Sequence, residues 1–82
     1  MVHGLVQGVF FRDSTRREAI GAGVDGWVRN EYDGTVCALL EGPPSAEERL
    51  VDWMREGPRN AVVERVEVSD AAPDDARGFQ VC

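Results

Sequence analysis

The residues best suited to chemistry lie near the start of the sequence, where a glycine-containing loop runs into a segment of helix-forming composition. Gly8 lacks a Cβ atom, so the backbone can curve there and approach a ligand closely. Successive N–H groups in such a loop form a concave anion site beside the positive end of a helix. Arg12 falls in the first helical turn and offers a planar fork that matches two oxygens of a phosphate or carboxylate. Residues 7–12 thus predict an anion cradle, with a plain tight turn beside a solvated arginine as the alternative.

Composition and charge limit the partners of this cradle. The chain has 82 residues, of which 43% are hydrophobic, and this predicts a single domain over residues 1–82 with one modest core. The formal net charge of −6 argues against nucleic acid as a partner. Residues 1–30 carry four arginines and three carboxylates, whereas residues 31–82 carry five and twelve. An anionic ligand is therefore expected at the end of the sequence that contains Arg12.

Several kinds of chemistry are excluded by residue type. Every basic residue is an arginine, so there is no lysine for a Schiff base or for a Walker-type phosphate loop. Cys37, Cys82 and the single His3 do not have the spacing of a metal site, so we expect no metal and no cofactor. No apolar run reaches the length of a membrane span and no signal peptide is evident, which predicts a cytoplasmic protein with no membrane partner.

Hydrophobic periodicity and turn signals predict five strands and two helices. The predicted strands cover residues 2–6, 24–30, 35–41, 61–69 and 79–81, and the predicted helices cover residues 12–22 and 45–56. Asp33-Gly34 indicates a tight hairpin turn between the second and third strands. Ser45 and Glu48 have the spacing of a capping box, and Pro44 argues against an earlier start of the second helix.

The aromatic residues are expected to be mainly structural. Trp27, Trp53 and Phe79 are predicted to lie in the core. One of the two adjacent phenylalanines, Phe10 or Phe11, is expected to pack under the loop and fix its shape.

The order β-α-β-β-α-β with a short extra strand predicts an α+β, ferredoxin-like sandwich. This fold has a mixed, mainly antiparallel sheet of four to five strands with two helices on one face. Its first two strands are parallel and flank the third, so the loop after strand one and the end of strand two should lie roughly 10 Å apart. The fold hosts many functions. Metal carriers with this fold need a CxxC motif in the first loop, and this loop has no cysteine. RNA binders need aromatic residues on the middle strands, and the third strand has none. A regulatory domain that binds a small effector remains an open alternative.

Two blocks of sequence, GLVQGVFFR and GWVRNEYDGTV, resemble the acylphosphatase family. The residues that match its pattern are Gly4, Val6, Gln7, Gly8, Val9, Phe11 and Arg12, then Gly26, Trp27, Val28, Asn30, Gly34 and Val36. The two blocks have the family's spacing without a gap. Residues 41–43 and 57–68 are also similar to later segments of the family, so the resemblance extends over essentially the whole chain and implies the fold derived above.

The resemblance implies hydrolysis of acyl phosphates to a carboxylate and inorganic phosphate, without metal, cofactor or covalent intermediate. It assigns the phosphoryl group to the guanidinium of Arg12 and to backbone amides, and the attacking water to Asn30. The amides are those of Gln7, Gly8, Val9, Phe10, Phe11 and Arg12. It further implies a monomer whose partner is a small-molecule acyl phosphate, with inorganic phosphate or sulfate as competing anions.

Three departures from the family pattern keep other hypotheses open. Leu5 stands where the family usually has arginine, Glu31 follows Asn30 where many relatives have threonine, and the first strand is short. These differences motivate a non-catalytic module that senses an effector or phosphate with the same cradle. A second alternative is a stand-alone relative of the acylphosphatase-like domain of carbamoyl-transferring maturation proteins, whose longer chains carry zinc-finger cysteines that this sequence lacks.

Overall fold

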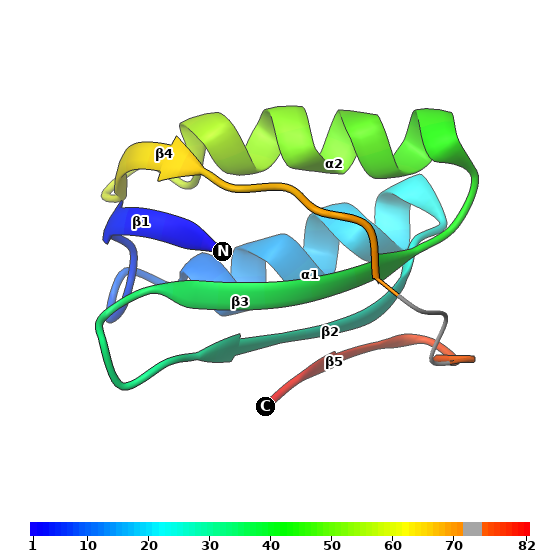
Figure 1. Ribbon diagram of the computed structural model, residues 1–82, viewed down its shortest axis with the longest axis horizontal. Coiled ribbons are helices and arrows are strands. Elements are labelled where there is room, and N and C mark those ends of the chain that lie inside the picture. The colour runs from blue at the N-terminus through cyan, green and yellow to red at the C-terminus, as the bar shows by residue number, and fades with distance from the viewer. Residues whose placement is uncertain (72–74) are drawn as a thin grey trace.

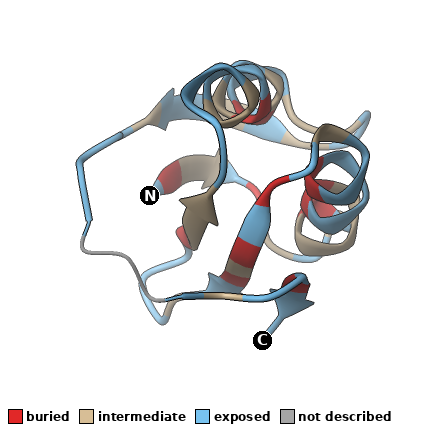
Figure 2. Ribbon diagram, turned by 90° about the vertical axis from the view of Figure 1, so that its right-hand side faces the viewer, coloured by how far each residue is buried: buried red, intermediate tan, exposed pale blue. Residues whose placement is uncertain are grey.

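The computed structural model describes residues 1–71 and 75–82, whose strands form one five-stranded sheet. Both helices pack against the same face of that sheet (Figures 1 and 2). The elements are β1 (Val2–Leu5), α1 (Phe11–Ala22), β2 (Asp25–Asn30), β3 (Val36–Glu41), α2 (Pro44–Glu56), β4 (Val62–Val66) and β5 (Phe79–Val81). This arrangement confirms the predicted α+β, ferredoxin-like fold.

The order of the strands brings three chain segments to one edge of the sheet. The order is β4-β1-β3-β2-β5, and both β1 and β2 pair antiparallel with β3. Consequently β1 and β2 are parallel to each other, as predicted, and β5 pairs parallel with β2. Because parallel strands end at the same edge, the loop after β1 lies at the same edge as the ends of β2 and β5.

The first strand is joined very unevenly to its two neighbours. It pairs with β4 along its length, from Val2 opposite Val66 to Leu5 opposite Val62, with a bulge between His3 and Gly4. With β3 its register contains the single pair Val2 and Val36. Beyond Val36, the edge of β3 on the side of β1 is therefore not paired with β1, and it borders a hollow.

The core lies between the sheet and the two helices. Its buried side chains are Val2, Val6, Phe11, Ala19, Val24, Val28, Val36, Leu50, Met54 and Phe79. Phe11 is only 1% exposed, and its ring lies 5.8 Å from that of Trp53 on α2. Phe11 is thus the phenylalanine that packs beneath the loop, because Phe10 remains 80% exposed.

The second helix begins differently from its sequence prediction. It starts at Pro44, and its N-cap is Pro43, with no hydrogen bond from a capping side chain. The predicted capping box of Ser45 and Glu48 is therefore wrong. Proline is tolerated at the first helical position because its φ is already helical and the N–H that it lacks would have no helical partner.

Trp27 of β2 lies outside the core in which it was expected. Trp27 is half-buried between buried Gly26 and Val28, so strand alternation directs it to the face opposite the helices. The guanidinium of Arg29 lies over its ring, 4.7 Å from the centroid. The prediction that Trp27 is a core residue is wrong, whereas Trp53 packs against the core and Phe79 is buried.

Candidate active site

A cavity of about 250 Å³ opens at the edge of the sheet where the loop after β1 meets the ends of β2 and β5. Its lining residues are Val6, Gly8, Phe10, Phe11, Arg12, Asp13, Asn30 and Val81. The cavity thus joins the glycine loop, the first turn of α1 and the ends of two parallel strands.

The loop that enters α1 has the backbone geometry of an anion-binding turn. Gly8 has φ 73° and Phe10, the N-cap of the helix, has φ 59°, so both are left-handed. The helix begins with a hydrogen bond from the N–H of Ser14 to the carbonyl of Phe10, at 2.9 Å. Alternation of left-handed and ordinary residues brings successive N–H groups toward one side, and the first N–H groups of a helix have no carbonyl partner within it. The space where a Cβ of Gly8 would lie is open.

Arg12 is held at the cavity by the last strand. Its Nη1 donates a hydrogen bond of 2.7 Å to the carbonyl oxygen of Cys82, which directly follows β5. A guanidinium has five N–H donors in one plane. One such contact orients this plane and leaves the other donors for a ligand oxygen in the cavity.

Gln7 links the loop to the turn that follows β2. Its side-chain Nε2 donates hydrogen bonds to the carbonyl oxygens of Glu31, at 2.7 Å, and Thr35, at 3.0 Å. Asn30, the last residue of β2, directly precedes Glu31. The position of Asn30 relative to the loop is therefore set by a side chain of the loop itself.

The carboxylates near the cavity are paired with arginines. The Nε of Arg29 contacts the Oε1 of Glu31 at 2.7 Å, and this hydrogen bond raises the pKa of Arg29 above its ordinary value. Asp13, which lines the cavity, contacts Arg17 one turn along α1 at 3.1 Å. The negative charge that Glu31 adds beside Asn30 is thus partly offset.

The turn between β2 and β3 is fixed by Asp33. Its Oδ1 accepts hydrogen bonds from the hydroxyl of Thr35, at 2.6 Å, and from the N–H of Thr35, at 3.0 Å. These two bonds favour the ionised form and lower the pKa of Asp33 below its ordinary value. Since Gln7 bonds to the carbonyl of the same Thr35, the turn and the loop form one connected unit.

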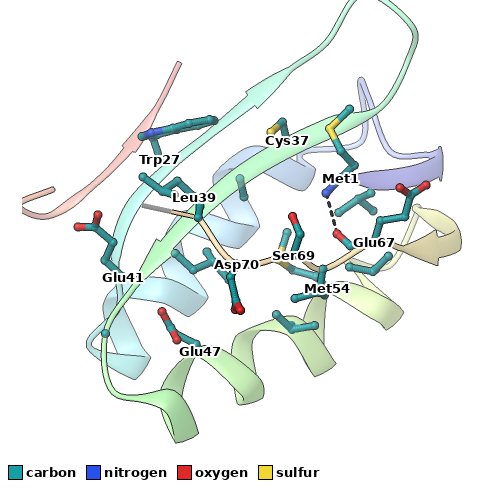
Figure 3. Close-up of a pocket in the computed structure, with 18 residues that line it drawn as sticks. Met1, Trp27, Cys37, Leu39, Glu41, Glu47, Met54, Glu67, Ser69 and Asp70 are labelled. Atoms are coloured by element: carbon teal, nitrogen blue, oxygen red, sulfur yellow. Dashed lines mark hydrogen bonds between the residues drawn. The ribbon is translucent and has the colours of Figure 1, made fainter. Parts of the chain in front are cut away.

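A larger hollow of about 780 Å³ lies between β3, α2 and the chain that follows β4 (Figure 3). Four carboxylates line it, those of Glu41, Glu47, Glu67 and Asp70, against one cation, the amino group of Met1. That amino group already donates to the carbonyl of Glu67 at 3.0 Å. The described lining of this hollow has more carboxylates than cations, although Glu67 is paired with Arg65, so the smaller cavity with Arg12 is the better candidate for an anionic ligand in spite of its size.

The structure brings together most of the residues predicted for the site. Gly8, Phe10, Phe11, Arg12 and Asn30 line one cavity. The side chain of Val9 packs against the core instead, and that of Gln7 is turned toward the β2–β3 turn. Leu5 is 69% exposed at the end of β1.

Two contributors to the site were missed from the sequence. Val81 lines the cavity, and the side chain of Gln7 acts as a bridge, whereas only its backbone had been assigned a role. The parallel pairing of β5 with β2 places Val81 opposite Val28, two residues before Asn30, and the local sequence of β5 does not indicate this pairing. Nothing in the sequence near Gln7 indicates its partners, which lie 24 and 28 residues away.

The described residues contain neither a cluster suited to a metal ion nor a membrane-spanning helix. Across residues 1–71 and 75–82, no group of three or more His, Cys, Asp or Glu side chains is arranged to hold a metal ion. Neither of the two helices in these ranges is long and apolar enough to cross a membrane.

The fold and the cavity together define a ferredoxin-like α+β protein with a cavity at one sheet edge that is lined by Arg12 and a glycine loop. The family model for acylphosphatase matches residues 1–81. An acylphosphatase from Acidovorax sp. (strain JS42) is 54% identical over 79 residues, which cover 96% of this chain and 81% of the relative. The structure of an acylphosphatase from Coxiella burnetii superimposes with a TM-score of 0.95 at 37% identity, covering 99% of this chain and 85% of that one. The chain therefore belongs to the acylphosphatase family of enzymes.

The structure of T. kodakarensis HypF is also similar to this chain. It superimposes with a TM-score of 0.86 at 29% identity and covers 99% of this chain, but this chain covers only 11% of HypF. The similarity is therefore to one part of a much longer protein, whereas the acylphosphatase from Coxiella burnetii is matched over most of its length.

Proposed function

We propose that the protein hydrolyses the bond between the carboxyl oxygen and phosphorus of acyl phosphates by direct attack of an oriented water. One observation carries this proposal: Arg12, the left-handed loop at Gly8 and Phe10, and Asn30 all line one small cavity. Membership of the acylphosphatase family supports the reaction class.

In this proposal the cradle stabilises the phosphoryl group. Arg12 and the backbone N–H groups of residues 7–12 contact the equatorial oxygens, where charge accumulates as the reaction proceeds. These donors are held by the loop, by the start of α1 and by the contact of Arg12 with the Cys82 carbonyl. Because they are already in place, little reorganisation is needed in the transition state.

Asn30 holds the water in line with the leaving carboxylate. The water oxygen forms a bond to phosphorus as the bond from phosphorus to the carboxyl oxygen breaks, and that electron pair departs with the carboxylate. The proton of the water passes to the phosphate product or to solvent. A carboxylate is the base of an acid with a pKa of about 4, so it leaves readily and no strong general base is needed. Gln7 positions Asn30 through its bonds to the carbonyls of Glu31 and Thr35.

Three finer properties belong to the same proposal. Inorganic phosphate and sulfate compete for the cradle, because each presents the tetrahedral oxygens that Arg12 and the loop would bind. A monomer is sufficient for the proposed reaction, because one chain supplies every residue assigned to the site. Its compartment is the cytoplasm, a proposal supported by the two free thiols of Cys37 and Cys82.

Hydrolysis of benzoyl phosphate in ¹⁸O-enriched water with EDTA present tests the reaction. We expect turnover with one labelled oxygen in each phosphate and none in benzoate, because water attacks phosphorus. Label in benzoate would place the attack at the carbonyl carbon and contradict the mechanism. Absence of turnover by protein with native circular dichroism would favour a module that only binds the anion.

The variant Asn30→Ala tests the role of the water-orienting residue. Loss of positioning is expected to lower kcat by about 10²-fold while the inhibition constant of phosphate changes little. Asn60→Ala, in the exposed turn before β4, is the control and should leave both values unchanged. Loss of phosphate inhibition in Asn30→Ala would instead assign Asn30 to the cradle.

A further inference from the structure

Phe10 has an unfavourable backbone conformation, and its apolar side chain is exposed to water. Its φ of 59° is left-handed, a region that bulky residues rarely adopt. Its side chain is 80% exposed, and packing beneath the loop is supplied by Phe11, which is 1% exposed. Single exposed apolar side chains are common on protein surfaces, but Phe10 also lines the cavity, where an apolar side chain is suited to contact a ligand.

A second partly exposed apolar side chain borders the same cavity. Val81, 41% exposed, lines it from β5, and Val6, 1% exposed, lines it from the start of the loop. Since β5 runs parallel to β2, Val81 lies at the sheet edge where Asn30 ends β2. The cavity therefore combines polar groups suited to an anion with apolar surface from the loop and the last strand.

On the basis of the proposed hydrolysis, we infer that Phe10 and Val81 bind the acyl half of the substrate. The preferred substrates are acyl phosphates whose acyl group is uncharged and apolar, above all an aromatic one. A phosphoryl group bound by Arg12 and the loop leaves the acyl group at the rim of the cavity, where these two side chains lie. Phenyl rings favour offset or edge contacts with another ring, and the exposed ring of Phe10 can provide them.

Charge and size in the cavity favour the same substrate class. Asp13, which lines the cavity, and Glu31, which follows Asn30, are each paired with an arginine, but the whole chain has a net charge of −6, so an acyl group with its own carboxylate is disfavoured. The volume of about 250 Å³ suits a compact acyl group. Cavities for larger ligands usually measure about 300–1,000 Å³.

The ratio of kcat/KM for benzoyl phosphate to that for acetyl phosphate tests the inference. Both substrates present the same phosphoryl group, so damage to the cradle affects both alike and cancels in the ratio. We expect Phe10→Ala to lower this ratio about tenfold and Val81→Ala to lower it about threefold. Phe10→Leu, which keeps an apolar group without a ring, should fall between Phe10→Ala and the wild type.

Ile20→Ala is the matched control. Ile20 is an apolar side chain of α1 that is 55% exposed but does not line the cavity. The ratio should be unchanged in this variant. An equal fall of the ratio in Ile20→Ala would show that general loss of apolar surface, and not acyl contact, accounts for the effect.

Binding of unreactive analogues separates failure of this inference from failure of the proposed hydrolysis. Phenacylphosphonate and acetonylphosphonate, in which a CH₂ group replaces the bridging oxygen, are titrated into wild type, Phe10→Ala and Val81→Ala. The wild type should prefer the phenacyl compound and lose that preference in Phe10→Ala, whether or not turnover occurs. Equal affinity of the wild type for both analogues, or ratios unchanged in both variants, would overturn the inference and leave the hydrolysis intact.

Discussion

The two helices of this fold begin in similar topological positions, but only α1 begins with a left-handed loop and an arginine in its first turn. At α1 the chain enters through Gly8 and Phe10, both left-handed, and Arg12 lies in the first turn. At α2 it enters through two consecutive prolines, and Glu47 lies in the first turn. Pro44 has no N–H group to offer, and the carboxylate of Glu47 already interacts favourably with the positive end of the helix.

This contrast teaches that a helix N-terminus alone is not an anion site. Both helices have the same dipole, and both have one acid in the first turn, Asp13 in α1 and Glu47 in α2. At α1, however, Asp13 contacts Arg17, and the guanidinium of Arg12 is oriented by the carbonyl of Cys82. Loop geometry and an oriented positive charge, rather than the dipole, distinguish the two ends.

The largest expected effect comes from removing the charge that distinguishes α1. Arg12→Ala should lower kcat/KM for benzoyl phosphate by at least about 10²–10³-fold, the usual cost of losing one donor to a developing charge. Arg12→Lys should not restore activity, because a point charge does not reproduce the planar fork. Arg49→Ala, an exposed arginine of α2, is the control and should stay near wild type. Near-wild-type turnover in either Arg12 variant would remove Arg12 from the mechanism.

A smaller effect comes from the loop geometry. Gly8 and Gly78 both have φ 73° and open space around a would-be Cβ. Alanine at either position should therefore lower the free energy of unfolding in urea by roughly 1 kcal/mol. Only Gly8→Ala should also weaken phosphate inhibition, by about fivefold, because only the backbone strain at position 8 lies in the loop proposed to bind phosphate. Equal phosphate affinity of the two variants would show that the left-handed turn at Gly8 is not needed for binding.

The smallest effect is a pH dependence of stability at the turn that follows Asn30. The hydrogen bonds from Thr35 lower the pKa of Asp33 in the folded protein, so the ionised form stabilises the fold. This contribution is present above the unfolded pKa of about 3.9 and is lost as the pH falls through the lower folded pKa. The stability difference between wild type and Asp33→Ala should therefore shrink when urea unfolding is repeated at successively lower pH below 4. A constant difference would contradict the assignment.

Elements with a clear local signal were predictable from the sequence, including the turn at Asp33-Gly34 and the loop at Gly8. The start of α2 was not, because a capping box at Ser45 and a proline at the first helical position are both good local signals, and only one can be used. The side of the sheet on which Trp27 lies follows from alternation with Val28, but residue type alone suggested the core.

Within the cavity, Arg12, Gly8 and Asn30 were predicted, whereas the contributions of β5 and of the Gln7 side chain were not. Arg12 and Gly8 belong to one short loop, and Asn30 was assigned from the family resemblance and lies at the sheet edge where the parallel strands β1 and β2 end. The contribution of Val81 depends on which strand β5 joins, and local propensity has no bearing on that choice. The bonds of the Gln7 side chain depend equally on tertiary structure.

The site also has an order of formation. Val6 and Val81 line one cavity, and Arg12 is held by a carbonyl 70 residues away, so the beginning and the end of this sequence must come together before the site is complete. Pairings between distant residues form slowly, because chain entropy is lost before the contacts compensate for it. A nascent chain that has emerged only as far as β4 already contains the cradle sequence and Asn30, yet Arg12 lacks the carbonyl that orients it. During synthesis and during refolding, activity should therefore appear only when β5 joins the sheet beside β2.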